Sequence, residues 1–233
     1  MKVILSGATG YIGKEVLSQA LNHPSITELV CITRRPLPEP FATNPKVKVI
    51  VLDDFLSYPP QVLSELKGAE ACIWALGAPA FRMSDLEECR KIEIGFTHAA
   101  GEAFASSLAP QLKEQGKTFR FVYLSGAWAE RDASKKLWFM PQTRMIKGEV
   151  ERGLIALQQK ESNNFEVTVI RPTGVLPKYI MIPNLLIGLL NFVKLDTVAS
   201  VMVDEAVGGV NGHRTLEASD LRAKAQKLSA SNK

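Results

Sequence analysis

The sequence predicts an α/β fold in which a doubly wound parallel sheet carries helices on both faces. Six short apolar runs alternate with segments of helical periodicity, and each run is mostly apolar on both faces, as buried parallel strands are. A glycine-rich turn, GATGYIG, directly follows the first run. The chain has 233 residues, of which 46% are hydrophobic, so it can bury one sizeable core and we expect a single domain over 1–233.

The first run and its turn predict an anion site. In the pattern of Gly7, Gly10 and Gly13, the first glycine allows a tight bend, the second admits a bound group and the third packs helix against strand. The apolar positions that follow predict a helix over 11–21. Free N–H groups at its start, around Tyr11 and Ile12, would face a pyrophosphate with the help of the helix dipole. The turn therefore predicts dinucleotide binding by a Rossmann fold.

The remaining elements follow in βαβ order. Strands are expected at 2–6, 28–33, 46–52, 70–76, 119–125 and 165–172. Helices are expected at 11–21, around 60–67, around 85–115 and at 142–160. About 1–175 would form the cofactor core, and about 176–233 a small substrate-side region.

The C-terminal region begins with an uncharged apolar stretch at 179–193. This stretch is shorter than the roughly 20 residues that span a bilayer, and Pro183 interrupts it, so we expect no membrane span. A buried helix or a pocket wall is expected, with interfacial membrane contact as a lesser alternative. A helix at 196–207, a turn at 208–212, a strand at 213–218 and a helix at 219–228 complete the chain.

Composition argues against several classes of partner. The net charge of +4 is spread along the chain without a basic stripe, which argues against nucleic acid. His23, His98 and His213 lie far apart without partners four residues away, so no metal site is expected. The three cysteines lack paired spacing and no secretion signal is visible, so we expect buried, reduced thiols in a cytoplasmic protein.

The end of the second strand indicates which dinucleotide binds. An acidic residue there holds the adenosine ribose hydroxyls of NAD, whereas arginine accommodates the 2′-phosphate of NADP. Here the strand continues into Arg34 and Arg35. Because guanidinium groups present a fork of donors that suits phosphate, the sequence favours NADP(H) over NAD(H).

Four further segments resemble those of one enzyme family. The third strand runs into VLDDF, the fourth into ALGAP and the sixth into VIRPTGVL, and MIKGEVE lies in the helix expected at 142–160. With the glycine turn, these segments identify the chain as resembling the atypical short-chain dehydrogenases/reductases, an NAD(P)-binding, epimerase-like Rossmann family. The resemblance covers most of the chain.

The resemblance implies cofactor contacts along the whole sheet edge. Asp54, or less well Asp53, would meet the adenine; Leu76 and Gly77 would lie beside the ribose, and Pro172 and Val175 near the nicotinamide. The expected cofactor-binding residues are Gly7, Thr9, Gly10, Tyr11, Ile12, Gly13, Arg34, Arg35, Asp54, Leu76, Gly77, Lys147, Pro172 and Val175.

The catalytic set of the family is a serine followed by Tyr-x-x-x-Lys. Ser125 at the end of the fifth strand and Lys147 in the following helix match it, but Thr143 occupies the tyrosine position. A threonine hydroxyl is a far weaker acid than a phenol. Three explanations are open. Tyr179 or Tyr123 would supply the proton in place of Thr143, or catalysis would need no tyrosine, or the protein would bind the cofactor without turning it over.

Three functions follow from these alternatives. The first is an NADP(H)-dependent oxidoreductase acting on a small to medium apolar carbonyl or alcohol, through Ser125, Lys147 and Thr143. The second is a non-catalytic NADP(H)-binding regulator with a protein partner. The third is a redox-neutral isomerase or cyclase on the same fold.

Overall fold

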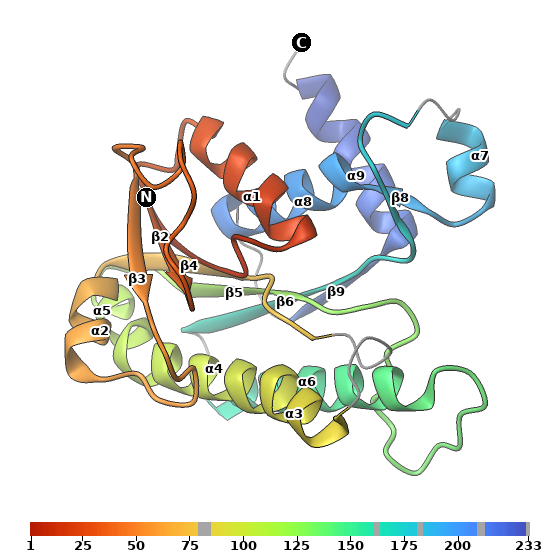
Figure 1. Cartoon of the computed structure of the whole chain (residues 1–233), viewed down its shortest axis with the longest axis horizontal. Coiled ribbons are helices and arrows are strands. Elements are labelled where there is room, and N and C mark those ends of the chain that lie inside the picture. Colours follow the sequence, from red (N-terminus) through yellow and green to blue (C-terminus); the bar gives the residue numbers. More distant parts are fainter. Residues whose placement is uncertain (79–84, 161–163, 181–183, 209–212, 232–233) are drawn as a thin grey trace.

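A seven-stranded parallel sheet lies at the centre of the molecule, with helices on both faces (Figure 1). The computed structural model describes residues 1–78, 85–160, 164–180, 184–208 and 213–231. The strand order is β3-β2-β1-β4-β5-β6-β9. This arrangement confirms the predicted fold class. The strands are β1 (Lys2–Ser6), β2 (Glu28–Thr33), β3 (Val47–Val51), β4 (Ala69–Trp74), β5 (Phe119–Leu124), β6 (Phe165–Arg171) and β9 (Arg214–Glu217).

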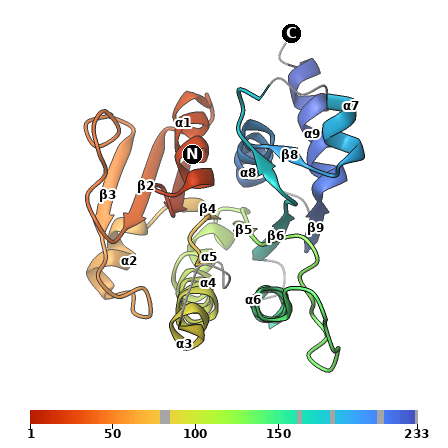
Figure 2. The ribbon, with the colours of Figure 1, turned by 45° about the vertical axis from the view of Figure 1, so that its right-hand side comes forward.

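Two helical layers enclose the sheet, as the turned view in Figure 2 also shows. One layer contains α1 (Tyr11–Asn22), α8 (Leu195–Gly208) and α9 (Ala218–Ser231), and its core is mainly aliphatic. The other contains α2 (Pro60–Leu66), α4 (Phe96–Ser107), α5 (Ala109–Lys113) and α6 (Pro141–Lys160). Its core is aromatic, with the Trp74 and Phe121 rings stacked 5.9 Å apart. The two cores hold the sheet rigidly between them.

The strands differ in burial according to their place in the sheet. β1, β2, β4, β5 and β6 are buried along most of their length, as their continuous apolar runs predicted. β3 is one of the two edge strands of this sheet, with β9 at the other edge, and its residues are half-buried or exposed. The expectation of burial on both faces is therefore wrong for β3, because an edge strand has a neighbour on one side only.

The helix expected around 85–115 is interrupted. It consists of α3 (Leu86–Arg90), a π-helical turn η2 (Lys91–Gly95), α4 and α5. A π-turn inserts one extra residue into the helical ladder and rotates the side chains that follow, and such turns often occur at functional sites. Here it carries a buried carboxylate, that of Glu93.

The C-terminal segment contributes to the central layers. β9 pairs with β6 as the seventh strand, and α8 packs against α1, β4 and β5. β7 (Val175–Leu176) and β8 (Val193–Lys194) form a separate two-stranded sheet. Between them α7 (Asn184–Leu189) exposes Leu186 and Leu189 and buries Ile187, so the expectation of a buried helix over 179–193 is wrong for this helix. Pro183 lies outside the described residues.

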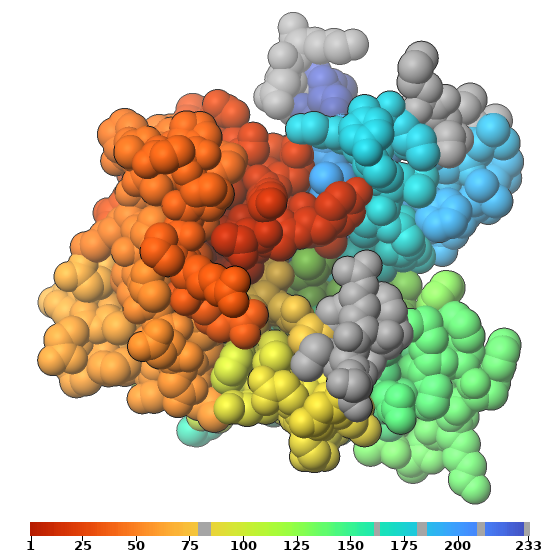
Figure 3. All heavy atoms as spheres, viewed as in Figure 1, coloured from red at the N-terminus to blue at the C-terminus, as the bar shows by residue number. Residues whose placement is uncertain are grey.

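The strand order reverses between β1 and β4, which start the two halves of the sheet. In doubly wound sheets a crevice forms at this reversal, beyond the carboxyl ends of the strands. The turn after β1 and residues 75–78 after β4 meet there. Figure 3 shows the surface on which the segments that follow the strands come together.

Two further properties concern membranes and metals. Within the described ranges, no helix is both long and apolar enough to cross a bilayer. The same ranges hold no cluster of three or more histidine, cysteine or acidic side chains arranged to bind a metal ion. The three cysteines are free and buried.

Candidate functional site

The three glycines of the first turn have different neighbours. Gly7 has φ +75°, and a Cβ there would lie 2.5 Å from the backbone of Ala75. A Cβ on Gly13 would overlap the carbonyl oxygen of Gly7. At Gly10 the nearest atom to an added Cβ is the Gly7 oxygen, at 3.2 Å, and the residue faces a cleft. Gly7 and Gly13 therefore allow close packing, whereas Gly10 keeps space open for a bound group.

A first cleft of about 520 Å³ lies between this turn and the end of β2. Arg34 and Arg35 lie at its rim with exposed side chains, and the Thr33 hydroxyl fixes the bend by donating to the Arg35 carbonyl oxygen at 2.7 Å. The residues that line it include no carboxylate: Gly7, Ala8, Thr9, Gly10, Ile32, Thr33, Arg34, Arg35, Pro36, Ala75, Leu76 and Gly77. Both arginines are thus free to face an anionic group.

The aspartate expected to meet the adenine is not part of the lining of either cleft. Asp54 is exposed, and its Oδ1 accepts the N–H of Leu56 at 2.9 Å within its own turn. Neither Asp54 nor Asp53 is among the residues that line the two clefts described here.

A second cleft of about 440 Å³ continues the first and shares Gly10, Ala75, Leu76 and Gly77 with it. It brings together ten of the predicted site residues from five segments of the chain. These residues are Gly10, Tyr11, Ile12, Leu76, Gly77, Ser125, Thr143, Lys147, Pro172 and Val175. The sheet edge thus assembles the predicted catalytic residues next to the glycine turn.

Lys147 is held by a carboxylate that the sequence did not reveal. Its Nζ donates to Glu93 Oε2 at 2.9 Å and to the Leu124 carbonyl oxygen at 3.2 Å. Glu93 is buried, and its Oε1 accepts the N–H of Ala78 at 2.8 Å. An ammonium group has three N–H donors, so one remains for a ligand in the cleft.

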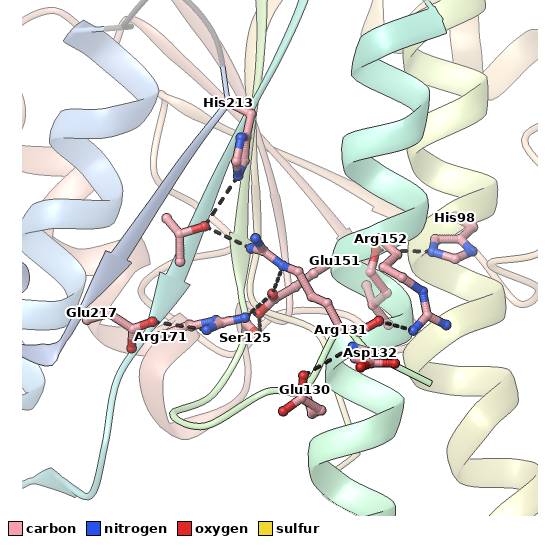
Figure 4. Close-up of polar contacts among 12 residues, drawn as sticks. His98, Ser125, Glu130, Arg131, Asp132, Glu151, Arg152, Arg171, His213 and Glu217 are labelled. Atoms are coloured by element: carbon pink, nitrogen blue, oxygen red, sulfur yellow. Dashed lines mark hydrogen bonds and ion pairs between the residues drawn. The ribbon is translucent and has the colours of Figure 1, made fainter. Parts of the chain in front are cut away.

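Ser125 is held by a second buried carboxylate, that of Glu151 (Figure 4). The Ser125 hydroxyl donates to Glu151 Oε1 at 2.6 Å. A carboxylate can only accept hydrogen bonds, so the single proton of the hydroxyl points away from the cleft. Towards the cleft, Ser125 can present only its oxygen lone pairs.

Two guanidinium groups balance the charge of Glu151 (Figure 4). Arg171 Nε donates to Oε1 at 2.9 Å, and Arg131 Nε donates to Oε2 at 2.6 Å. Arg171 also pairs with Glu217 on β9 at 3.0 Å. The network therefore ties α6 to the ends of β5, β6 and β9.

Of the two buried glutamates, the sequence contained a signal for Glu151 but none for Glu93. Thr143, Lys147 and Glu151 are spaced four residues apart on α6, so they share one face of the helix. Glu151 also closes the KGEVE run, and Arg171 precedes the Pro172 of VIRPTGVL. Glu93 had no such signal, because the π-turn that aims it at Lys147 leaves no mark in the periodicity.

The tyrosines considered as proton donors lie outside the cleft. Tyr179 is 82% exposed and lines neither cleft. Tyr123 is fully buried beneath Lys147, whose Nζ lies 5.1 Å from the ring centre, and its hydroxyl has no hydrogen-bond partner among the described residues. Burial, with the nearby Glu93 and Glu151, raises the pKa of its phenol well above the usual value. Tyr11 is the one tyrosine that lines the cleft.

Comparison with known families and sequences places the fold in context. A family model described as NAD(P)H-binding matches residues 7–179. Leucinostatins biosynthesis cluster protein T of Purpureocillium lilacinum is 34% identical over 125 residues, which are 54% of this chain and 42% of that protein. The chain thus spans less than half the length of that relative. Protein FMP52, mitochondrial, of Candida albicans is 25% identical over 91% of this chain and 90% of that protein.

Solved structures agree with the fold at low sequence identity. MoeE5 in complex with UDP-glucose and NAD has a TM-score of 0.69 at 18% identity, over 99% of this chain and 82% of that one. Gre2 of Candida albicans in complex with NADPH has a TM-score of 0.69 at 17% identity, over 93% and 78%. At these identities the likeness concerns the fold alone.

The relatives contradict the cytoplasmic location that the sequence predicted. The FMP52 proteins of Candida albicans, Debaryomyces hansenii and Eremothecium gossypii are named mitochondrial. The physical argument was too narrow, because buried free thiols argue only against an oxidising compartment and do not select the cytoplasm.

The Glu151 network predicts a large difference between two glutamates on the same helix. Glu151→Ala leaves two guanidinium groups and the Ser125 hydroxyl without their buried acceptor, so we expect the free energy of unfolding to fall by about 3–5 kcal/mol. Glu149→Ala is the matched control, because Glu149 pairs with Arg90 at a half-exposed position and its loss should cost less than about 1 kcal/mol. Urea denaturation monitored by circular dichroism measures both values. Equal losses would show that the network does not organise the site.

Proposed function

The chain belongs to the NAD(P)H-binding family, and from this premise we propose that it is an NADP(H)-dependent oxidoreductase acting on a small to medium apolar carbonyl or alcohol. The observation that carries the proposal is the continuity of the two clefts through Gly10, Ala75, Leu76 and Gly77. One end presents two arginines and the other a serine and a lysine, which is the order of groups that an extended dinucleotide and its substrate require.

The residues at the first cleft fit a phosphorylated dinucleotide. Gly10 leaves its side open at the start of α1, where unpaired helical N–H groups favour a pyrophosphate. Arg34 and Arg35 would hold the 2′-phosphate, because no carboxylate lines this cleft to compete for them. Leu76 and Gly77 would border the ribose, and Pro172 and Val175 the nicotinamide, which supplies or accepts a hydride when bound.

The second cleft suits a mainly apolar substrate with one oxygen atom. Its walls include Ile12, Leu124, Ala127 and Val175. The one N–H of Lys147 that neither Glu93 nor Leu124 engages would be shared, as a bifurcated hydrogen bond, between the ribose and the reacting oxygen. Ser125 would accept a hydrogen bond from the hydroxyl of an alcohol, since its own O–H points to Glu151. Thr143 would add a weak donor at the position that a phenol occupies in the family.

A non-catalytic regulator is the second candidate. Two observations favour it: Thr143 replaces the strong proton donor, and Ser125 cannot donate to a developing oxyanion while Glu151 accepts its proton. Both would slow carbonyl reduction without weakening cofactor binding.

Turnover distinguishes the two candidates. We expect the purified protein to oxidise NADPH slowly with at least one member of a panel of aldehydes and ketones. Thr143→Tyr should raise that rate, because a phenol would lie one helical turn from Lys147, and general acid catalysis is worth about 10²–10⁴ in rate. Tyr179→Phe is the control and should leave the rate unchanged, since Tyr179 lines neither cleft. Tight NADPH binding without oxidation, in both the wild type and Thr143→Tyr, would favour the regulator.

Cofactor preference is tested by calorimetry with NADPH and NADH. We expect NADPH to bind more tightly, and Arg34→Glu to weaken NADPH binding about 10- to 100-fold, because hydrogen bonds between charged groups contribute about 1.5–3 kcal/mol. NADH affinity serves as the internal control and should change little. Arg35→Glu shows which arginine carries more of the preference. Equal affinities of the wild type for the two cofactors would exclude the assignment.

The open side of Gly10 predicts a variant that folds but does not bind. Gly10 has φ −77°, which any residue can adopt, so Gly10→Val should change the melting temperature little and abolish NADPH binding. Gly13→Val is the contrasting variant, because its Cβ would overlap the Gly7 oxygen and the fold should be destabilised. Differential scanning fluorimetry with and without NADPH measures both effects. Unchanged affinity in Gly10→Val would make the turn purely structural.

A further inference from the structure

Three aromatic side chains form one exposed cluster on the loop between β5 and α6. Trp138 is 93% exposed, Trp128 58% and Phe139 43%. The Phe139 ring lies 6.1 Å from Trp128 and 5.8 Å from Trp138, centre to centre, so the rings make a continuous surface. Large apolar side chains that are exposed together commonly mark a contact surface. We call Trp128, Trp138 and Phe139 the aromatic cluster.

The loop backbone holds the aromatic cluster in place. Arg144 Nε donates to the Trp128 carbonyl oxygen at 2.7 Å, and the Glu130 N–H donates to the Arg144 carbonyl oxygen at 2.9 Å. Trp128 and Met140 have φ of +60° and +45°, a conformation that is unfavourable for bulky residues. Such conformations persist where the surrounding structure imposes them, often at functional positions. The rings are therefore kept at the surface by a defined loop structure.

The aromatic cluster borders the second cleft. Ala127, Ala129 and Arg144, which flank or hold Trp128, all line that cleft. A second apolar surface lies at the same end of the molecule, because α7, with exposed Leu186 and Leu189, follows the carboxyl end of β6 as the loop follows that of β5 (Figures 1 and 2). Whatever covers the cluster would lie next to the mouth of the cleft.

Basic residues accompany the rings. Lys135 and Lys136 lie between Trp128 and Trp138 and are exposed. Lys135 pairs with Glu130 at 2.7 Å and Arg131 pairs with the buried Glu151. Lys136 and Arg144 are therefore the cations of this loop without an ion pair among the described residues. Tryptophan and phenylalanine beside lysine are typical of segments that sit at the boundary between lipid headgroups and acyl chains. Lys136 would meet anionic headgroups while the rings enter the boundary region.

We propose that the aromatic cluster docks the protein onto an anionic lipid surface, with the mouth of the second cleft turned towards the lipid. The contact is peripheral, consistent with the lack of a spanning helix in the described ranges. An apolar compound dissolved in the bilayer could then reach the cleft without crossing water. Docking itself requires neither bound cofactor nor turnover, so it stands apart from the proposed redox activity.

A second copy of the chain is a less suitable occupant. In a symmetric contact the same patch faces itself, so Lys136 would approach its own counterpart. The apolar area is also small: an aromatic side chain can bury about 150–250 Å², and Trp128 and Phe139 are already partly covered, which leaves the cluster short of the about 800 Å² per partner of a stable interface.

Vesicle binding by the full chain tests the proposal. We expect sedimentation with vesicles of phosphatidylcholine and phosphatidylserine, weaker sedimentation with phosphatidylcholine alone, and a blue shift of tryptophan emission on binding. Trp138→Ser/Phe139→Ser should reduce the partition coefficient at least about tenfold, because each large apolar side chain contributes about that factor. Lys136→Ser should reduce it about fivefold on anionic vesicles only. Val51→Thr, at an exposed apolar residue of the edge strand, is the control and should bind as the wild type.

Two results would overturn the proposal. One is the absence of sedimentation with either vesicle. The other is binding that Trp138→Ser/Phe139→Ser leaves unchanged, because lipid contact would then use another surface. Analytical ultracentrifugation of the same variants identifies the competing occupant: a dimer that Trp138→Ser/Phe139→Ser dissociates, together with no vesicle binding, would assign the aromatic cluster to self-association. Melting temperatures near that of the wild type establish that the variants are folded.

Discussion

The buried carboxylate of Glu151 is the constraint on which the site depends. A fully buried charge is tolerated only when ion pairs and hydrogen bonds compensate its loss of hydration. Here Ser125 and Arg131, from the segment that follows β5, and Arg171, at the end of β6, supply them. Satisfying this one charge therefore fixes where α6 lies against the carboxyl edge of the sheet. Lys147, one helical turn before Glu151, is placed over the cleft as a consequence.

The second buried carboxylate, that of Glu93, orients Lys147 as Glu151 orients Ser125. One oxygen of Glu93 accepts an N–H of Lys147, and the other accepts the backbone N–H of Ala78. Ala78 directly follows Leu76 and Gly77, which line both clefts. The result is a pair of ligand-facing groups with opposite hydrogen-bonding character: Lys147 can only donate and Ser125 can only accept. An alcohol, which can accept from one group and donate to the other, matches this pair better than a ketone does. The two glutamates thus set the polarity of the site, Glu93 from the lining of the cleft and Glu151 from behind Ser125.

Local patterns explain how far the sequence could predict this structure. The glycine turn and the buried strands follow from spacing within single segments. Ser125, Thr143 and Lys147 were assigned from the resemblance to a family, and the structure brings these three residues to one cleft. Three features depend on tertiary contacts and escaped prediction. The π-turn shifts Glu93 by one residue within an otherwise helical pattern, the partner of the predicted strand at β9 is set only by the fold, and Leu186 and Leu189 of α7 are apolar yet exposed. The hydrogen bond that Asp54 accepts within its own turn was likewise not visible in the sequence.

The two ends of the crevice also differ in how water reaches them. At the end nearer β2, Arg34 and Arg35 are exposed to solvent, and screening limits each charge there to a modest contribution. The fork of donors on a guanidinium group has a geometry that suits a phosphate. At the end nearer α6, Glu93, Glu151 and Tyr123 are buried, so polar groups there act at a lower effective dielectric and their orientation matters more than their number. Exposed aromatic rings at the rim of this end would keep water from it once an apolar surface covers them. The chain therefore combines a solvent-facing site suited to anion recognition with an adjoining site whose chemistry is set by fixed, buried hydrogen bonds.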